Sequence, residues 1–128
     1  MISDITISEA IEVGKILKRS KALATNKVVK DIIDHVTDKD SLALKMVSNV
    51  GNILGIWCSK EFDDYVSLSF FYMDESVRRK PQVIVFFKHC YELLNSEKPL
   101  LILTKDITGF DRYVQKVGKD LYQFVGLR

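Results

Sequence analysis

An alternating segment at residues 65–72, followed closely by helical spacing, is the feature that most limits how this chain can fold. Its period of two predicts a half-buried strand. One face would carry Val66, Leu68, Phe70 and Tyr72, and the other Tyr65, Ser67, Ser69 and Phe71. From Pro81 onward the apolar residues recur at helical spacing, and proline is favoured at the first position of a helix. The sequence therefore predicts a strand, a short loop and a helix that begins at Pro81.

Three consecutive cations, Arg78, Arg79 and Lys80, stand in the loop between this strand and this helix. The N-terminus of a helix exposes unpaired N–H groups and the positive end of the helix dipole, so an anion is stabilised there. Guanidinium and ammonium groups add to that potential and can bind phosphate directly. The loop is therefore a candidate phosphate site. The alternative is a solvated turn, because charged residues between a strand and a helix often contact only water.

The other apolar patterns predict helices at residues 8–19 and 26–36, a hairpin from 42–47 and 53–58, and a strand at 100–103. A short helix is expected from Thr108 or Gly109 to Gly118, with a final strand at 121–125. Together these elements predict one α/β (α+β) domain over residues 1–128, with a mixed sheet of about six or seven strands and about four helices. Trp57 and Phe70 are expected to be buried.

The order of the elements resembles that of the GCN5-related N-acetyltransferase (GNAT) family, with the weak segment 2–7 as the first strand. The family's signature joins its fourth strand to its third helix. It runs through a hydrophobic residue, a short acidic or proline stretch, arginine or glutamine, two residues, glycine, one residue, and glycine or alanine. Met73 and Arg78 match this signature, whereas Pro81 and Val83 replace its glycine and its glycine or alanine. The resemblance thus covers nearly the whole chain by element order and two short segments by residue.

The second of these segments, 112–118, resembles the end of the family's fourth helix. When Gly118 is aligned with the family's glycine, Tyr113 lies one residue away from the position of the family's tyrosine. The resemblance implies an N-acyltransferase that moves an acetyl group from acetyl-coenzyme A to an amine of a small molecule or protein. Tyr113 would donate a proton to the departing thiolate. The implied coenzyme-binding residues are Phe71, Tyr72, Met73, Arg78, Arg79, Lys80, Gln82, Val83 and Ile84. Pro81 has no N–H, and losing one charge-assisted hydrogen bond typically costs about 1.5–3 kcal/mol.

Two functions stay open at this point. The strand has no carboxylate between Tyr65 and Met73 to take up the proton of an amine, which acyl transfer to nitrogen requires. This absence, with Pro81 and the displaced Tyr113, favours a catalytically inactive binding or assembly module of the same fold. The order of the elements and the clustered cations favour the enzyme. A nucleic-acid-binding α/β domain is a third interpretation, which the mild net charge of +2 disfavours.

The remaining chemistry-bearing residues are scattered. His35 and His89 lie on predicted helices without other ligands nearby, so we interpret both as surface or boundary residues and predict no metal site. Cys58 and Cys90 fall in apolar segments, as buried thiols of a reducing compartment do. No apolar stretch approaches membrane length and no signal region is recognisable, so we expect a cytoplasmic protein. The last strand would leave an exposed edge at which a homodimer could form.

Overall fold

The structure is a computed structural model that describes residues 1–19, 27–104 and 111–126. Its elements follow in the order β1 (Ile2–Asp4), the short 3-10 helix η1 (Ile7–Glu9), α1 (Ala10–Arg19), α2 (Lys27–Thr37), β2 (Ser41–Val47), β3 (Ile53–Glu61), β4 (Val66–Met73), α3 (Pro81–Leu94), β5 (Leu100–Leu103), β6 (Val114–Gly118) and β7 (Leu121–Phe124). The helix predicted to begin at Pro81 does begin there.

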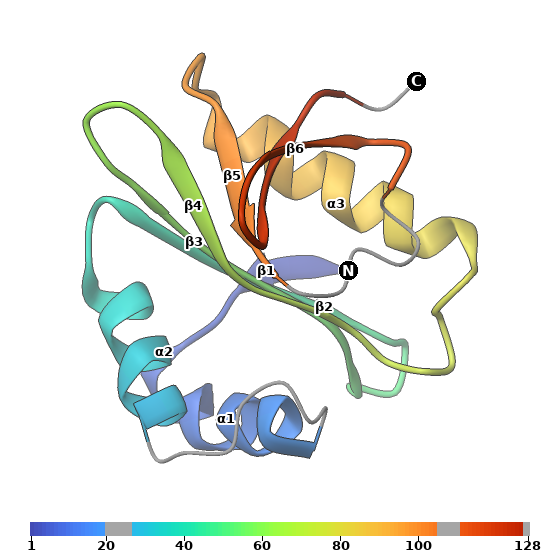
Figure 1. Cartoon of the computed structure of the whole chain (residues 1–128). Helices are drawn as coiled ribbons and strands as arrows, with labels where there is room; N and C mark the ends of the chain where they lie inside the picture. Colours follow the sequence, from blue (N-terminus) through green and yellow to red (C-terminus); the bar gives the residue numbers. More distant parts are fainter. Residues whose placement is uncertain (20–26, 105–110, 127–128) are drawn as a thin grey trace.

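One seven-stranded sheet runs through the molecule in the order β1-β2-β3-β4-β5-β7-β6. All neighbouring strands are antiparallel except β4 and β5, which are parallel. The predicted mixed sheet is therefore confirmed, with β4 at its centre. Helices α1 and α2 cover one face, and α3, which connects β4 to β5, covers the other (Figure 1).

Each face of the sheet buries its own apolar cluster. The cluster under α3 includes Trp57, Phe86 and Phe87, which are fully buried, and Trp57 Nε1 donates a hydrogen bond to Ser59 Oγ at 2.8 Å. The cluster under α1 and α2 includes Ile32 and Ile56. Trp57 is thus buried as predicted, because a buried indole needs a partner for its N–H and finds one two residues further along its own strand.

The two cysteines are free thiols, as predicted, and lie in different clusters. Cys58 lies on the α1/α2 side of the sheet and Cys90 on the α3 side. Burial raises the pKa of each thiol to about 12, because a thiolate is poorly solvated among apolar side chains.

Helices α1 and α2 approach each other closely at Gly14. A Cβ atom placed on Gly14 would lie 2.7 Å from Val29 Cγ2, a separation at which the Val29 side chain or one of the two helices would have to shift. The absence of a side chain at Gly14 therefore sets the spacing of the two helices that cover this face of the sheet.

The predicted helix ending at Gly118 is wrong in its described part, because Val114–Gly118 forms strand β6. The valines at its start and near its end suit a helix or a strand, and pairing with β7 decides between them. Gly118 pairs with Leu121 across a tight turn in which Asp120 takes a positive φ of 54°. Three α-helices are described where about four were expected, and residues 105–110 lie outside the described part of the chain.

Candidate functional site

A β-bulge interrupts β4 at its middle. Cys58 of β3 lies opposite Phe70 and Ser59 lies opposite Leu68, so Ser69 is an extra residue with no partner position on β3. A bulge bends the strand and changes which face the following side chains take. The prediction of one unbroken alternation is therefore wrong after Leu68. The α3 side carries Val66, Leu68, Phe71 and Met73, and the α1/α2 side carries Phe70 and Tyr72.

The same position marks the end of the pairing between β4 and β5. Their parallel ladder joins Val66 to Leu100 and ends with Leu68 opposite Ile102, while β4 continues to Met73. Ser69 is thus the first residue of β4 beyond the ladder. We call the end of this ladder, at Leu68 on β4 and Ile102 on β5, the fork; β5 itself ends one residue later, at Leu103.

The predicted phosphate loop follows β4 directly and is a defined turn. The Asp74 carboxylate accepts hydrogen bonds from the Ser76 hydroxyl at 2.6 Å and the Ser76 amide at 3.0 Å. These two bonds hold the pKa of the Asp74 carboxyl below its ordinary value. The Asp74 carbonyl accepts the amides of Val77 and Arg78, and the Val77 side chain is buried in the α3-side cluster. The loop is therefore anchored to the core.

The three cations of the loop have different surroundings. Arg78 Nε donates to the Met73 carbonyl at 2.8 Å, and its guanidinium lies 5.8 Å from the centre of the Tyr72 ring. Arg79 and Lys80 are exposed, and within the described residues their side chains form no ion pair. Arg79 also takes a positive φ of 69°, which a residue with a side chain adopts only at a cost. Arg78 is thus partly structural, whereas Arg79 and Lys80 are exposed without an ion pair among the described residues, and their contact with phosphate stays a prediction.

The first turn of α3 completes this part of the site. Lys80 caps the helix and Pro81 is its first residue, so Gln82 supplies the first amide that the helix can offer an anion. The Val83 amide already donates to the Lys80 carbonyl at 3.2 Å. The predicted coenzyme residues of the loop and first turn therefore lie together at the end of β4 and directly after it: Met73, Arg78, Arg79, Lys80, Gln82, Val83 and Ile84. Phe71 and Tyr72 precede them on opposite faces of the sheet.

Tyr113, the predicted proton donor, lies in a turn before β6 and not on a helix. It is half-buried and packs against the α3-side cluster, and its carbonyl accepts the Val125 amide at 2.8 Å. Its role as a proton donor stays a prediction.

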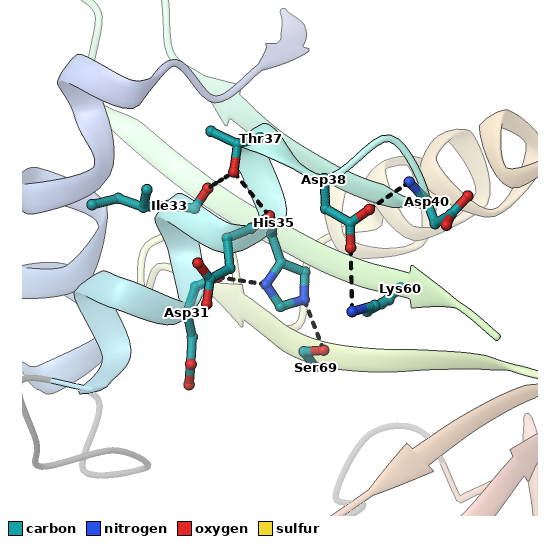
Figure 2. A network of polar contacts seen from close by, with 9 residues as sticks. Asp31, Ile33, His35, Thr37, Asp38, Asp40, Lys60 and Ser69 are labelled. Atoms are coloured by element: carbon teal, nitrogen blue, oxygen red, sulfur yellow. Dashed lines mark hydrogen bonds and ion pairs between the residues drawn. The ribbon is translucent and has the colours of Figure 1, made fainter.

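A polar pair that the sequence did not reveal joins α2 to the bulge. His35 Nε2 lies 3.0 Å from Ser69 Oγ, and His35 Nδ1 lies 2.6 Å from the Asp31 carbonyl oxygen. Figure 2 shows the imidazole reaching from α2 to the serine of the neighbouring strand. The Phe70 ring packs beside the imidazole, with ring centres 5.9 Å apart. His35 is half-buried, as predicted for a boundary residue. Phe70 was expected to be buried but is only half-buried, because the bulge turns its side chain toward α2.

Two further expectations concern absent features. Among the described residues, no group of three or more His, Cys, Asp or Glu side chains could hold a metal ion. In the same residues, no helix is long and apolar enough to span a bilayer.

Comparison with known proteins identifies solved structures that share this architecture. No protein-family model matches the sequence, and no curated protein matches it. Solved structures do match. The ribosomal-protein-S18-alanine N-acetyltransferase from Escherichia coli has a TM-score of 0.74 at 13% identity over 92% of this chain and 79% of that one. A GNAT family N-acetyltransferase from Escherichia coli in complex with coenzyme A has a TM-score of 0.69 at 16% identity over 96% and 78%. Aminoglycoside 6'-acetyltransferase type Ii has a TM-score of 0.68 at 11% identity over 100% and 99%. The chain has the GNAT fold.

Proposed function

We propose that the protein is an N-acyltransferase that moves an acetyl group from acetyl-coenzyme A to an amine of a small molecule or protein. The observation that carries this proposal is the continuity of the site. β4 continues beyond the fork without β5 as a neighbour and runs directly into a cationic loop at the N-terminus of α3. Two of the structural relatives act on an alanine of a ribosomal protein and on aminoglycosides, which are both amine acceptors.

Coenzyme A would lie along this continuous site in one orientation. Its phosphates would lie against Arg79, Lys80 and the Gln82 amide, where charge and helix dipole both favour an anion. Its pantetheine arm is an extended chain with amide groups, so it can lie along β4 as an added strand would. From Met73 back to Ser69 the strand spans roughly 13 Å. The arm would thus bring the thioester to the fork.

A catalytically inactive module of the same fold is the second candidate, and Pro81 favours it. Proline withholds the first N–H of α3, so the anion site has one donor fewer than a helix N-terminus with an ordinary first residue. A protein of this kind would keep the fold and bind coenzyme A weakly or not at all. β6 is an edge strand with three exposed residues, Gln115, Lys116 and Val117, at which a second copy could pair in either case. A cytoplasmic location and a single domain over residues 1–128 belong to the proposal as well.

Calorimetry with coenzyme A and acetyl-coenzyme A tests the binding step, and release of the coenzyme thiol tests transfer. The acceptor probes are an aminoglycoside and a short peptide with an N-terminal alanine. The charge-reversal variant Arg79→Glu/Lys80→Glu should abolish binding. The matched control, Lys88→Glu/Lys116→Glu, changes the net charge equally at exposed positions of α3 and β6 and should bind normally. Coenzyme binding without thiol release in the presence of either acceptor probe would favour the inactive module. Equal affinity for the coenzyme in both charge-reversal variants would exclude the loop as the phosphate site.

A further inference from the structure

The proposed reaction lacks a proton acceptor on β4, and α2 supplies a group suited to that role. An amine that attacks a thioester must lose a proton, and β4 has no carboxylate between its first and last residues. The only imidazole placed against β4 among the described residues is that of His35, whose Nε2 lies 3.0 Å from Ser69 Oγ. The other histidine, His89, is exposed on α3.

The hydrogen bonds of His35 define which nitrogen can accept a proton. The Asp31 carbonyl oxygen can only accept, so the 2.6 Å contact with His35 Nδ1 requires a hydrogen on Nδ1. In the neutral imidazole, Nε2 then carries the lone pair and accepts the hydroxyl hydrogen of Ser69. Here a hydroxyl is hydrogen-bonded to an imidazole, and a third group orients the imidazole. Side chains in this arrangement can remove protons from reacting groups.

The position of Ser69 matches the place where the reacting atoms would lie. Ser69 is the bulged residue and the first residue of β4 beyond the ladder with β5. With the phosphates at the loop after Met73, the thioester end of the coenzyme points back toward this residue. Ser69 is also exposed, so an acceptor amine can reach its hydroxyl from solvent. The bulge therefore brings the hydroxyl, the imidazole and the proposed thioester position together at the fork.

We infer that Ser69 and His35 form a proton relay for the acceptor amine; this inference rests on the proposed acyltransferase function. As the amine nitrogen bonds to the thioester carbon, its proton passes to Ser69 Oγ while the hydroxyl proton of Ser69 passes to His35 Nε2. The carbon–sulfur bond then breaks, and the coenzyme leaves as a thiolate with the bonding electron pair. The thiolate takes a proton from the predicted donor, Tyr113, which regains one from solvent, and the imidazolium returns its proton to solvent. The products are an N-acetyl amide and free coenzyme A.

The test compares kcat for thiol release with the KM for acetyl-coenzyme A, using the aminoglycoside and the N-terminal-alanine peptide as acceptors. His35→Gln keeps a hydrogen-bonding side chain that cannot take up a proton, and Ser69→Ala removes the relay hydroxyl. Both should lower kcat roughly a hundredfold while the KM for acetyl-coenzyme A stays unchanged. Ser69→Thr restores a hydroxyl and should recover most of the loss. His89→Gln is the control for the histidine change and should behave as the natural sequence does.

A spectroscopic measurement on the natural sequence keeps the inference testable if a variant folds poorly. Nitrogen-15 NMR of the imidazole should show hydrogen on Nδ1 of His35, and Ser69→Ala should shift the Nε2 resonance while Ser67→Ala should not. Hydrogen on Nε2 in place of Nδ1 would overturn the relay. Turnover that survives His35→Gln or Ser69→Ala within about twofold would overturn it as well, while leaving the acyltransferase in place. Coenzyme binding without thiol release by the natural sequence would instead refute both the function and the relay.

Discussion

Replacing Arg79 with glycine should separate the binding role of the loop from its contribution to folding. Arg79 holds a φ of 69°, and the left-handed conformation costs a residue with a side chain roughly 1–2 kcal/mol. Glycine avoids that cost but gives the unfolded chain more freedom, which removes about 0.5–1 kcal/mol of stability. The net expectation for Arg79→Gly is a folded state that is unchanged or more stable by about 1 kcal/mol.

The affinity of Arg79→Gly for coenzyme A should fall, although its stability is unchanged or higher. A hydrogen bond between a guanidinium and a phosphate contributes about 1.5–3 kcal/mol, so its loss should raise the Kd for coenzyme A on the order of ten- to a hundredfold. Thermal unfolding measures the first effect and calorimetry the second. A gain of about 1 kcal/mol corresponds to a rise in Tm of roughly 3–5 °C for a domain of this size.

Two controls make this result interpretable. Arg79→Ala removes the same charge but keeps the strained backbone, so it should weaken coenzyme binding equally without raising the Tm. Asn95→Gly relieves another positive φ, 45° at the end of α3, and should raise the Tm without changing the affinity. If Arg79→Gly lowers both the Tm and the affinity, the side chain supports the fold of the loop and the argument for a phosphate contact fails.

Two further predictions concern packing and buried thiols. Gly14→Ala should lower the free energy of unfolding by about 1 kcal/mol, because a clash with Val29 costing roughly 1–3 kcal/mol exceeds the gain in helix propensity of about 1 kcal/mol. Urea unfolding in a Val29→Ala background should show the opposite sign, and the same sign in both backgrounds would contradict the proposed contact. Cys58 and Cys90 should resist iodoacetamide at pH 8 in the folded protein and react after unfolding, because a pKa of about 12 leaves roughly one thiol in ten thousand ionised. Rapid alkylation of either native thiol would show that its burial is not maintained in solution.

Local patterns were sufficient to predict the strand, loop and helix at the centre of the site. The period changes from two to 3.6 within residues 65–94, and Pro81 fits only the first turn of a helix, so few alternatives existed. The strand β6 was missed because its valines and glycine satisfy helical spacing equally well. Pairing with β7 selected the strand, and such pairing is a property of the folded chain that a short window of sequence does not contain.

The bulge and the polar pair were missed for a related reason. In the sequence, the alternation of side chains between the two faces continues without a visible break through Ser69, because Phe70 and Phe71 are both aromatic and either can face the core. Ser69 and His35 are 34 residues apart, and the packing of α2 on the sheet brings them together. The signal in the sequence was a lone histidine on a helix and a lone serine on a strand, neither of which identifies its partner.

The extra residue in β4 also bears on how such a site could arise. If Ser69 were deleted, the remaining residues would alternate strictly, with Leu68, Phe71 and Met73 still on the α3 side and Phe70 and Tyr72 still opposite. The core would keep its side chains, while the hydroxyl that meets His35 would be gone. A one-codon insertion or deletion therefore separates a plain scaffold from one equipped with the relay. In a lineage of proteins with this fold, that difference could be gained and lost many times without rebuilding the interior.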